Sequence, residues 1–288
     1  MKKVSVRQIF LCVSIFIQST LFGQSLEDYI HENAIEVSDL TKLEDSIYKK
    51  FSHYKITLVG EFHGTNESAE FVNSLTNLLT KNNDTVLLGI EIPTDKLKTF
   101  IKKETLKNLI TSDFFSDLSV DGRNSKSWFN LIARQLKNKK VRLFFFDETQ
   151  QHSKLQIDRD SIMYLNVKTE MQKFPNAKTI LLSGNIHNKL KPYKNIYKLG
   201  RHLLLDKELN LTNKLRSINI SYEKGTMYNN VGQGLQIREL AKSDSPFAKA
   251  NSLKTYLLFF PDNYDYDYNC ILFCRELTAS KSFDLSED

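Results

Sequence analysis

The chain has 288 residues, of which 41% are hydrophobic and 26% are charged, as in a globular protein with a substantial core. The formal charge of +6 includes Lys2, Lys3 and Arg7, and residues 1–23 contain no acid, so a chain processed after residue 23 carries 6 − 3 = +3. This modest charge excludes the basic signature of a nucleic-acid-binding protein, and we expect no nucleic-acid partner.

The first 23 residues have the pattern of a signal peptide. Three positive residues precede a short apolar stretch over residues 9–17, and Gly23 provides a small residue at a cleavage point before Gln24. Because this stretch is short for a membrane span, an uncleaved anchor is the less favoured alternative. We therefore expect a single α/β domain over residues 24–288, without a transmembrane span. We expect it to be exported, as a periplasmic, outer-membrane-associated or secreted protein.

Strands and helices alternate through the first two thirds of the chain. Helical spacing of apolar residues covers 26–51, and a β-branched run over 56–59 predicts a buried strand. An amphipathic helix over 68–81 and a strand over 85–92 follow. Further predicted elements are a helix over 95–103, one or two short helices over 105–119, a loop over 121–124, a helix over 125–138, a strand over 141–146, a helix over 155–173 and a strand over 179–182.

The last third is predicted to be mostly β-structure. The expected strands cover 194–199, 215–222, 256–260 and 269–277. Alternation of strands and helices favours a parallel sheet with right-handed crossovers. The predicted fold class is α/β, with a mainly parallel sheet flanked by helices and additional edge strands in the C-terminal third.

Two titratable residues follow the first buried strand directly. Glu61 and His63 leave the end of that strand on the same side, since they are two residues apart. Gly64 lacks a Cβ and permits a tight turn, after which Thr65 or Asn66 can cap the next helix. In open parallel sheets ligands bind beyond the carboxyl ends of the strands, so we expect a functional site here.

Three more predicted strands lead into polar, titratable residues. Glu91 closes the second strand, Asp147 closes the third, and His187 lies in the loop after the fourth. If the sheet is parallel, these residues converge with Glu61 and His63 at one edge. A cap or salt bridge near a helix start is the alternative for Glu91, and a structural role for Asp147 stays open.

Four residues form a candidate substrate-binding set, namely Glu67, Arg123, Asp147 and Asn185. Glu67 falls in the first turn of a predicted helix, where the helix dipole favours an acid in any case. Arg123 lies in a loop and could hold a substrate carboxylate or phosphate by a bidentate bond. The alternative is a structural ion pair between Arg123 and Asp121.

Tyr264, Tyr266 and Tyr268 alternate with acidic residues. This pattern is typical of an edge strand or loop with one aromatic face. Packing of the three rings is the favoured interpretation, and contact with a planar ligand such as haem is the alternative.

Five motifs occur in the order GEFHGTNE (60–67), GIEIP (89–93), DGR (121–123), FFFDE (144–148) and SGNIHN (183–188). This order resembles the erythromycin esterase, ChaN-like haem-uptake and Tiki/TraB superfamily, in particular its uncharacterised secreted bacterial branch. The resemblance covers residues 56–280 and implies an α/β fold with a site at the strand ends. By resemblance to the esterase branch, the catalytic residues are Glu61, His63, Glu91 and His187.

One spacing departs from the esterase branch, in which two residues separate the Glu from the His of the first motif. Here only Phe62 lies between Glu61 and His63, as in the Tiki/TraB and ChaN branches. This difference argues against macrolide hydrolysis. The resemblance implies a metal-dependent protease in the Tiki-like case and haem binding in the ChaN-like case, and does not choose between them.

The leading hypothesis is an exported hydrolase of an ester or amide bond in a small molecule or peptide. Its catalytic residues could hold one divalent metal ion (Mn, Co or Zn), with a position open for water: Glu61, His63, Glu91 and His187. Without a metal, His63 would be the general base, oriented by Glu61 or Glu91, and His187 would stabilise the transition state. The alternatives are a protein that binds haem or a related ligand without turnover, and a scaffold with an inactive site. The sequence leaves the substrate and the oligomeric state open.

Overall fold

The structure is a computed structural model that describes residues 25–117, 121–154, 157–230, 232–250, 253–261 and 266–282. The predicted signal peptide lies outside the described residues, as do Tyr264 and the start of the helix predicted from residue 155. In the ranges that are described, none of the helices combines the length and the apolar composition needed to cross a membrane.

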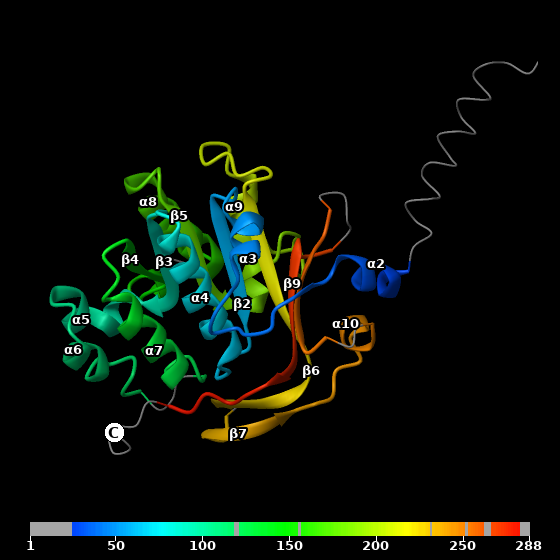
Figure 1. Ribbon diagram of the computed structural model, residues 1–288. Helices are drawn as coiled ribbons and strands as arrows, with labels where there is room; N and C mark the ends of the chain where they lie inside the picture. Colours follow the sequence, from blue (N-terminus) through cyan, green and yellow to red (C-terminus); the bar gives the residue numbers. More distant parts are fainter. Residues whose placement is uncertain are drawn as a thin grey trace, which may run out of the picture.

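A mixed sheet of nine strands forms the centre of the described part of the chain (Figure 1). The strands are β1 (Ile35–Glu36), β2 (Ile56–Glu61), β3 (Val86–Pro93), β4 (Val141–Asp147), β5 (Lys178–Gly184), β6 (Leu215–Asn230), β7 (Leu235–Leu240), β8 (Thr255–Phe259) and β9 (Cys270–Leu277). Their order is β1-β8-β9-β6-β2-β5-β3-β4, and β7 pairs with β6 outside this path. In this order, neighbouring strands from β9 to β4 run parallel to each other. Strand β8 pairs antiparallel with β9, and β7 pairs antiparallel with β6. The predicted α/β class is confirmed.

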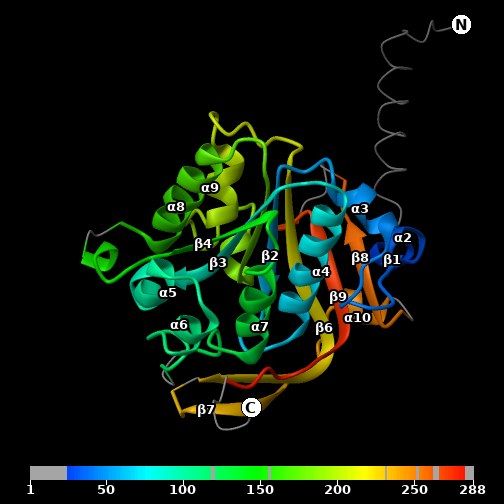
Figure 2. The ribbon, with the colours of Figure 1, turned by 60° about the vertical axis from the view of Figure 1, so that its left-hand side comes forward.

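Helices cover both faces of this sheet (Figure 2). They are α2 (Leu26–Asn33), α3 (Asp45–Phe51), α4 (Glu67–Lys81), α5 (Lys98–Lys102), α6 (Leu106–Ile110), α7 (Lys126–Gln135), α8 (Arg159–Lys173), α9 (Leu199–Leu205) and α10 (Pro246–Lys249), with the short 3-10 helices η1 (Thr94–Leu97), η2 (His152–Lys154) and η3 (Asn185–Asn188). Helices α3, α4 and α7 pack on one face, and α8 and α9 pack on the other.

The continuous apolar run in β2 follows from this double cover. Val59 packs into the core beneath α4 and α7, and its neighbour Leu58 packs into the core beneath α8 and α9. Successive side chains of a strand point to opposite faces. A strand that is covered on both faces can therefore be apolar at consecutive positions. The late strands extend the sheet on the other side of β2: β6 lies inside it, and β8 and β1 form its edge.

The prediction of helical structure throughout 26–51 is wrong in its middle part. Helix α2 ends at Asn33, and Ile35 pairs with Leu257 of β8. The backbone N–H of Val37 donates to Thr255 O, which keeps this segment extended. Unpaired groups at a sheet edge are satisfied by an added strand, and this pairing takes precedence over the helical periodicity.

The strand predicted over 194–199 is also wrong. Lys194 and Asn195 have φ angles of 50° and 64°, and Tyr193 and Ile196 bond to each other across this tight turn. A left-handed backbone is incompatible with an extended strand. Helix α9 begins at Leu199, where the predicted strand was expected to end.

Candidate active site

The residues that follow the parallel strands meet at one edge of the sheet, as expected. Glu61 is the last residue of β2, Glu91 lies near the end of β3, and Asp147 ends β4. His187 lies in η3, directly after β5. In the sheet these strands stand in the order β2-β5-β3-β4, so the four ends are neighbours.

The turn after β2 is a tight one that requires glycine. Gly64 has a φ of 81°, and a Cβ at this position would lie 1.9 Å from the carbonyl oxygen of Tyr228 in β6. Gly122, in the loop over 121–124, has a φ of 102°, and a Cβ there would lie 2.4 Å from the same oxygen. Both glycines therefore let the β6–β7 hairpin approach the site closely.

Glu61 and His63 form a buried carboxylate–histidine pair. His63 Nδ1 lies 2.6 Å from Glu61 Oε1, and Trp128 Nε1 donates to Glu61 Oε2 over 2.7 Å. The Glu61 side chain is fully buried, whereas His63 is 23% exposed. When Nδ1–H donates to the carboxylate, Nε2 of a neutral His63 is the proton acceptor.

Burial and partners shift both pKa values of this pair. Burial raises the pKa of Glu61 above its usual value, against the bonds from His63 and Trp128. Burial alone lowers the pKa of His63, but the bond to Glu61 and the charges of Glu91 and Asp121 outweigh it, so this pKa is raised. His63 therefore holds a proton more tightly than an exposed histidine does.

A second pair repeats this arrangement at His187. His187 Nδ1 lies 2.7 Å from Asp160 Oδ1, which also accepts from the backbone N–H of Leu199. Lys198 Nζ donates to the other oxygen of Asp160 over 2.9 Å. Burial raises the pKa of Asp160, but these bonds, that of His187 first, outweigh burial and lower it. Asp160 is thus an ionised anchor for His187.

The two histidine rings flank Gly184 at the end of β5. A Cβ on Gly184 would lie 3.3 Å from His63 Nε2 and 3.7 Å from His187 Cδ2. The φ of Gly184 is −54°, an ordinary value, so the glycine is needed here for space and not for backbone conformation.

Glu91 is the centre of a charge network and is fully buried. Its Oε1 accepts from Arg123 Nη1 over 3.0 Å and from Arg159 Nη2, and its Oε2 accepts from Gly184 N over 2.7 Å. Burial raises the pKa of Glu91, but the positive charges, Arg123 foremost, lower it strongly. Glu91 is therefore an ionised holder of the two arginines.

Asp147 binds the same two arginines. Arg159 donates to both of its oxygens, over 2.7 Å and 2.8 Å, and Arg123 Nη1 donates to Oδ2 over 2.9 Å. Two parallel bonds from one guanidinium fix its position and orientation. Asp147, predicted as a substrate contact, is 2% exposed and orients the arginines.

Arg123 also forms the ion pair with Asp121 that the loop sequence suggested. Arg123 Nε donates to Asp121 Oδ1 over 2.9 Å, and Asp121 Oδ2 lies 3.9 Å from His63 Nε2. Burial raises the pKa of Asp121, but the charges of His63 and Arg123 outweigh it and lower the pKa. Asp121 thus connects the arginine network to the first histidine.

Two residues of the predicted substrate-binding set have contacts elsewhere. Glu67 Oε1 accepts from the backbone and hydroxyl of Thr278, which ties the C-terminal segment to α4. Asn185 Oδ1 accepts from Ile220 N, and its carbonyl accepts from the Tyr268 hydroxyl. These contacts hold the chain that surrounds the site.

Three important residues were not among the predicted site residues. Arg159 and Asp160 lie in the first turn of α8, because the helix begins at Arg159 with Asp158 as its N-cap. The N-cap signature of Asp158 could have placed this start correctly. Trp128 lies in the predicted helix over 125–138, and its indole N–H finds a buried acceptor in Glu61.

The residues proposed as metal ligands do not fit a divalent cation. In the described residues no group of three or more His, Cys, Asp or Glu side chains is arranged to hold a metal ion. A cation bound to Glu91 would lie beside the guanidinium groups of Arg123 and Arg159, which already neutralise this carboxylate. The set Glu61, His63, Glu91 and His187 therefore gains no support as a metal site from the described residues, and a metal held by it stays a prediction.

A cavity of about 340 Å³ borders the arginine network. Its lining includes Arg123, Asp147 and Arg159 of the network, together with Lys96 and Gln150. Arg159 is 33% exposed, whereas the carboxylates that it binds are buried. Among the charged groups of the network that line this cavity, the guanidinium of Arg159 is the most exposed.

A scan against protein-family models finds no match, and a search of the curated proteins finds none. Among solved structures, a protein from Bacillus cereus matches with a TM-score of 0.66 and 13% identity, over 90% of this chain and 98% of that chain. A succinoglycan biosynthesis protein has a TM-score of 0.66 and 12% identity, over 89% and 98%. A mutant erythromycin esterase EreC in its open conformation has a TM-score of 0.59 and 12% identity, over 85% and 97%. These similarities show the fold of this chain. It is the α/β fold that the order of the five motifs implies.

Proposed function

We propose that this chain is a metal-free hydrolase that cleaves an ester or amide bond with His63 as its general base. The observation that carries this proposal is the contact of 2.6 Å between His63 Nδ1 and buried Glu61. A histidine oriented by a carboxylate is the base of many hydrolytic sites, since the carboxylate fixes the tautomer and stabilises the imidazolium that forms.

In this mechanism His63 Nε2 takes a proton from water, and the water oxygen bonds to the carbonyl carbon of the substrate. The bond from this carbon to the leaving oxygen or nitrogen then breaks, and His63 returns the proton to the leaving group. Glu61 stabilises the protonated His63 between the two steps, because its buried carboxylate accepts a hydrogen bond from His63 Nδ1.

Arg159 is our candidate for stabilising the negative oxygen of the intermediate. Four of its five N–H groups are directed at Asp147, Glu91 and His187. The fifth belongs to Nη1, the atom that lies 3.3 Å from His187 Nε2. A rigidly held donor of this kind lowers the barrier, since it needs no reorganisation when charge develops. His187 would support this guanidinium and the transition state with it.

The proposal is tested by hydrolysis of a panel of p-nitrophenyl esters and peptide amides by the wild type and by His63→Ala. We expect turnover by the wild type and a loss of at least about 100-fold in the variant, with an unchanged circular dichroism spectrum. His31→Ala, at an exposed histidine of α2, is the matched control and should be fully active. Equal activity of His63→Ala and wild type would refute the proposal.

Haem binding without turnover is the second candidate, and the same proteins test it. If His187 were the ligand of the haem iron, its Nε2 would have to leave Arg159 Nη1, from which it lies 3.3 Å. The site therefore supports hydrolysis better. A Soret shift on titration with haem that is lost in His187→Ala, together with no hydrolysis by the wild type, would favour the haem reading.

We also propose that the hydrolase acts after export, in the periplasm, at the outer membrane or outside the cell. The signal-peptide pattern of residues 1–23 supports this proposal. N-terminal sequencing of protein recovered from each fraction should give Gln24 as the first residue, and a retained Met1 in all fractions would contradict export by cleavage.

A further inference from the structure

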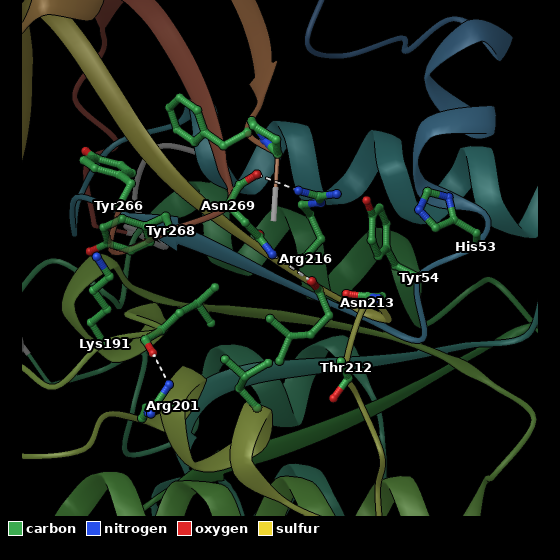
Figure 3. Close-up of a pocket in the computed structure, with 15 residues that line it drawn as sticks. His53, Tyr54, Lys191, Arg201, Thr212, Asn213, Arg216, Tyr266, Tyr268 and Asn269 are labelled. Carbon is green, nitrogen blue, oxygen red and sulfur yellow. Dashed lines mark hydrogen bonds between the residues drawn. The ribbon is translucent and has the colours of Figure 1, made fainter. Parts of the chain in front are cut away.

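A second cavity, of about 490 Å³, lies at the opposite end of the sheet from the candidate active site. We call it the basal cavity; its lining includes Tyr54, Lys191, Arg201, Arg216, Tyr266 and Tyr268 (Figure 3). Leu215 also lines it and pairs with Ile56, the first residue of β2, five residues before Glu61. At about 3.3 Å per residue the two sites are roughly 16 Å apart along the strand.

The basal cavity lies where the sheet ends, and part of its wall lies on the face of the sheet that carries α8, α9, α2 and α10. Leu203 and Leu215 belong to the core beneath α8 and α9, whereas Ile271 and Phe260 belong to the core beneath α2 and α10. Asn219 pairs with Ile271 and, by the alternation of β6, points to the same face as Leu215. Tyr54 and Arg216 complete the wall from the other face, so the cavity extends around the end of the sheet.

Positive charge gathers in this cavity. Lys191, Arg201 and Arg216 line it, and none of the described residues of its lining is acidic. The buried Nε of Arg201 has no hydrogen-bond partner among the described residues, while its Nη1 donates to Leu190 O. Burial, and next the charge of Arg216, lower the pKa of His53 at the rim, as expected in a positive field.

Aromatic rings also line the cavity. The guanidinium of Arg216 lies 4.2 Å from the centre of the Tyr54 ring, on the side of the cavity where Figure 3 shows both residues. The ring centres of Tyr266 and Tyr268 lie 5.8 Å apart on the other side of the cavity, and Figure 3 shows Lys191 below them. Rings and guanidinium planes of this kind stack on flat ligands.

We propose that the basal cavity binds a small organic anion that carries a planar ring, such as an aromatic sulfonate, carboxylate or phosphate ester. Its volume lies within the range of small-molecule sites. The cations would take the anionic group, and the tyrosines would contact the ring. This inference does not depend on the proposed hydrolysis, because the cavity shares none of its lining with the histidine pairs.

The test is calorimetric titration of the full chain with naphthalene-2-sulfonate, which has a ring and a charge and no ester or amide bond. Naphthalene-2-methanol supplies the ring alone and methanesulfonate the charge alone. We expect saturable binding of naphthalene-2-sulfonate and at least about 10-fold weaker binding of the other two. Binding of the neutral alcohol as tightly as the sulfonate, or no saturation up to millimolar sulfonate, would overturn the proposal.

Variants locate the binding. Arg201→Gln and Lys191→Gln should each weaken sulfonate binding about 10-fold, as expected for the loss of a charged hydrogen bond. Lys207→Gln removes the same charge at an exposed position outside the lining and should bind like the wild type. His63→Ala should also bind normally. Unchanged affinity in both cavity variants, or a loss of affinity in His63→Ala, would contradict the assignment.

Discussion

His187 Nδ1 lies 2.7 Å from Asp160 Oδ1, and this contact reproduces at the second histidine what Glu61 provides at the first. Each imidazole is fixed at Nδ1 by a buried carboxylate, so its Nε2 faces the site, where that of His187 contacts Arg159 Nη1. Since the rings flank Gly184, the two Nε2 atoms serve one site. Glu61 with His63 and Asp160 with His187 therefore form two matched pairs.

Asp160→Asn should reduce kcat strongly while leaving KM nearly unchanged. The amide cannot hold His187 in a single tautomer with a negative charge, and the orientation of Arg159 next to it would loosen. We expect a loss of about 10- to 100-fold in kcat. Asp158→Asn is the matched control, because Asn is an equally good N-cap for α8. Equal kcat in both variants would show that Asp160 has only a structural role.

Hydrolysis should increase with pH through a midpoint above 6.5, the ordinary pKa of histidine. The base must be neutral, and its pKa is raised, so the neutral form accumulates only at higher pH. Glu61→Gln removes the largest of the contributions that raise this pKa, and it leaves burial, which lowers the pKa, with the charges of Glu91 and Asp121. The rising limb of kcat/KM should then move to lower pH while the maximal rate falls. A limb that stays in place would mean that another group titrates.

Gly184→Ala should impair hydrolysis without unfolding the protein. The new methyl group would lie 3.2 Å from His63 Cε1, so the ring must move, whereas the backbone at −54° accepts alanine without strain. A displaced base should cost about 10-fold or more in kcat. The midpoint of thermal unfolding, measured on the same sample, should change little. Full activity would show that His63 can move away without consequence.

Trp128→Phe should lower the free energy of unfolding by about 1–3 kcal/mol. The change removes the N–H that donates to Glu61 Oε2 and leaves this buried oxygen unsatisfied. Phe129→Leu, at a largely buried ring on the same helix without such a bond, serves as the packing control. Urea unfolding measures this free energy in both single variants and in the double variant. The cost of Trp128→Phe should be much smaller when Glu61→Gln is already present. Additive losses in the double variant would show that the bond is not coupled to Glu61.

The convergence of Glu61, His63, Glu91, Asp147 and His187 could be predicted from the sequence because parallel strands bring their carboxyl ends to one edge. The roles of Glu91 and Asp147 could not, since they depend on which residues reach them. Their partner Arg159 arrives from a helix whose start was placed four residues too early.

Other differences have the same physical origin, because long-range partners decide local structure. Edge pairing of Ile35 with Leu257 interrupts the helical periodicity of 26–51. The apolar spacing around Trp128 indicates burial but not the acceptor of its N–H. The metal hypothesis rested on residue types at the strand ends and on the resemblance to Tiki-like proteases, and the sequence does not reveal that two guanidinium groups lie beside Glu91.

The most direct measurement of the central claim is kcat/KM of chelator-treated wild type, His63→Ala and His31→Ala on the best substrate of the panel. The account predicts that the treated wild type and His31→Ala keep full activity and that His63→Ala loses at least about 100-fold. Loss of activity in the treated wild type, restored by a divalent metal, would contradict it, as would an active His63→Ala.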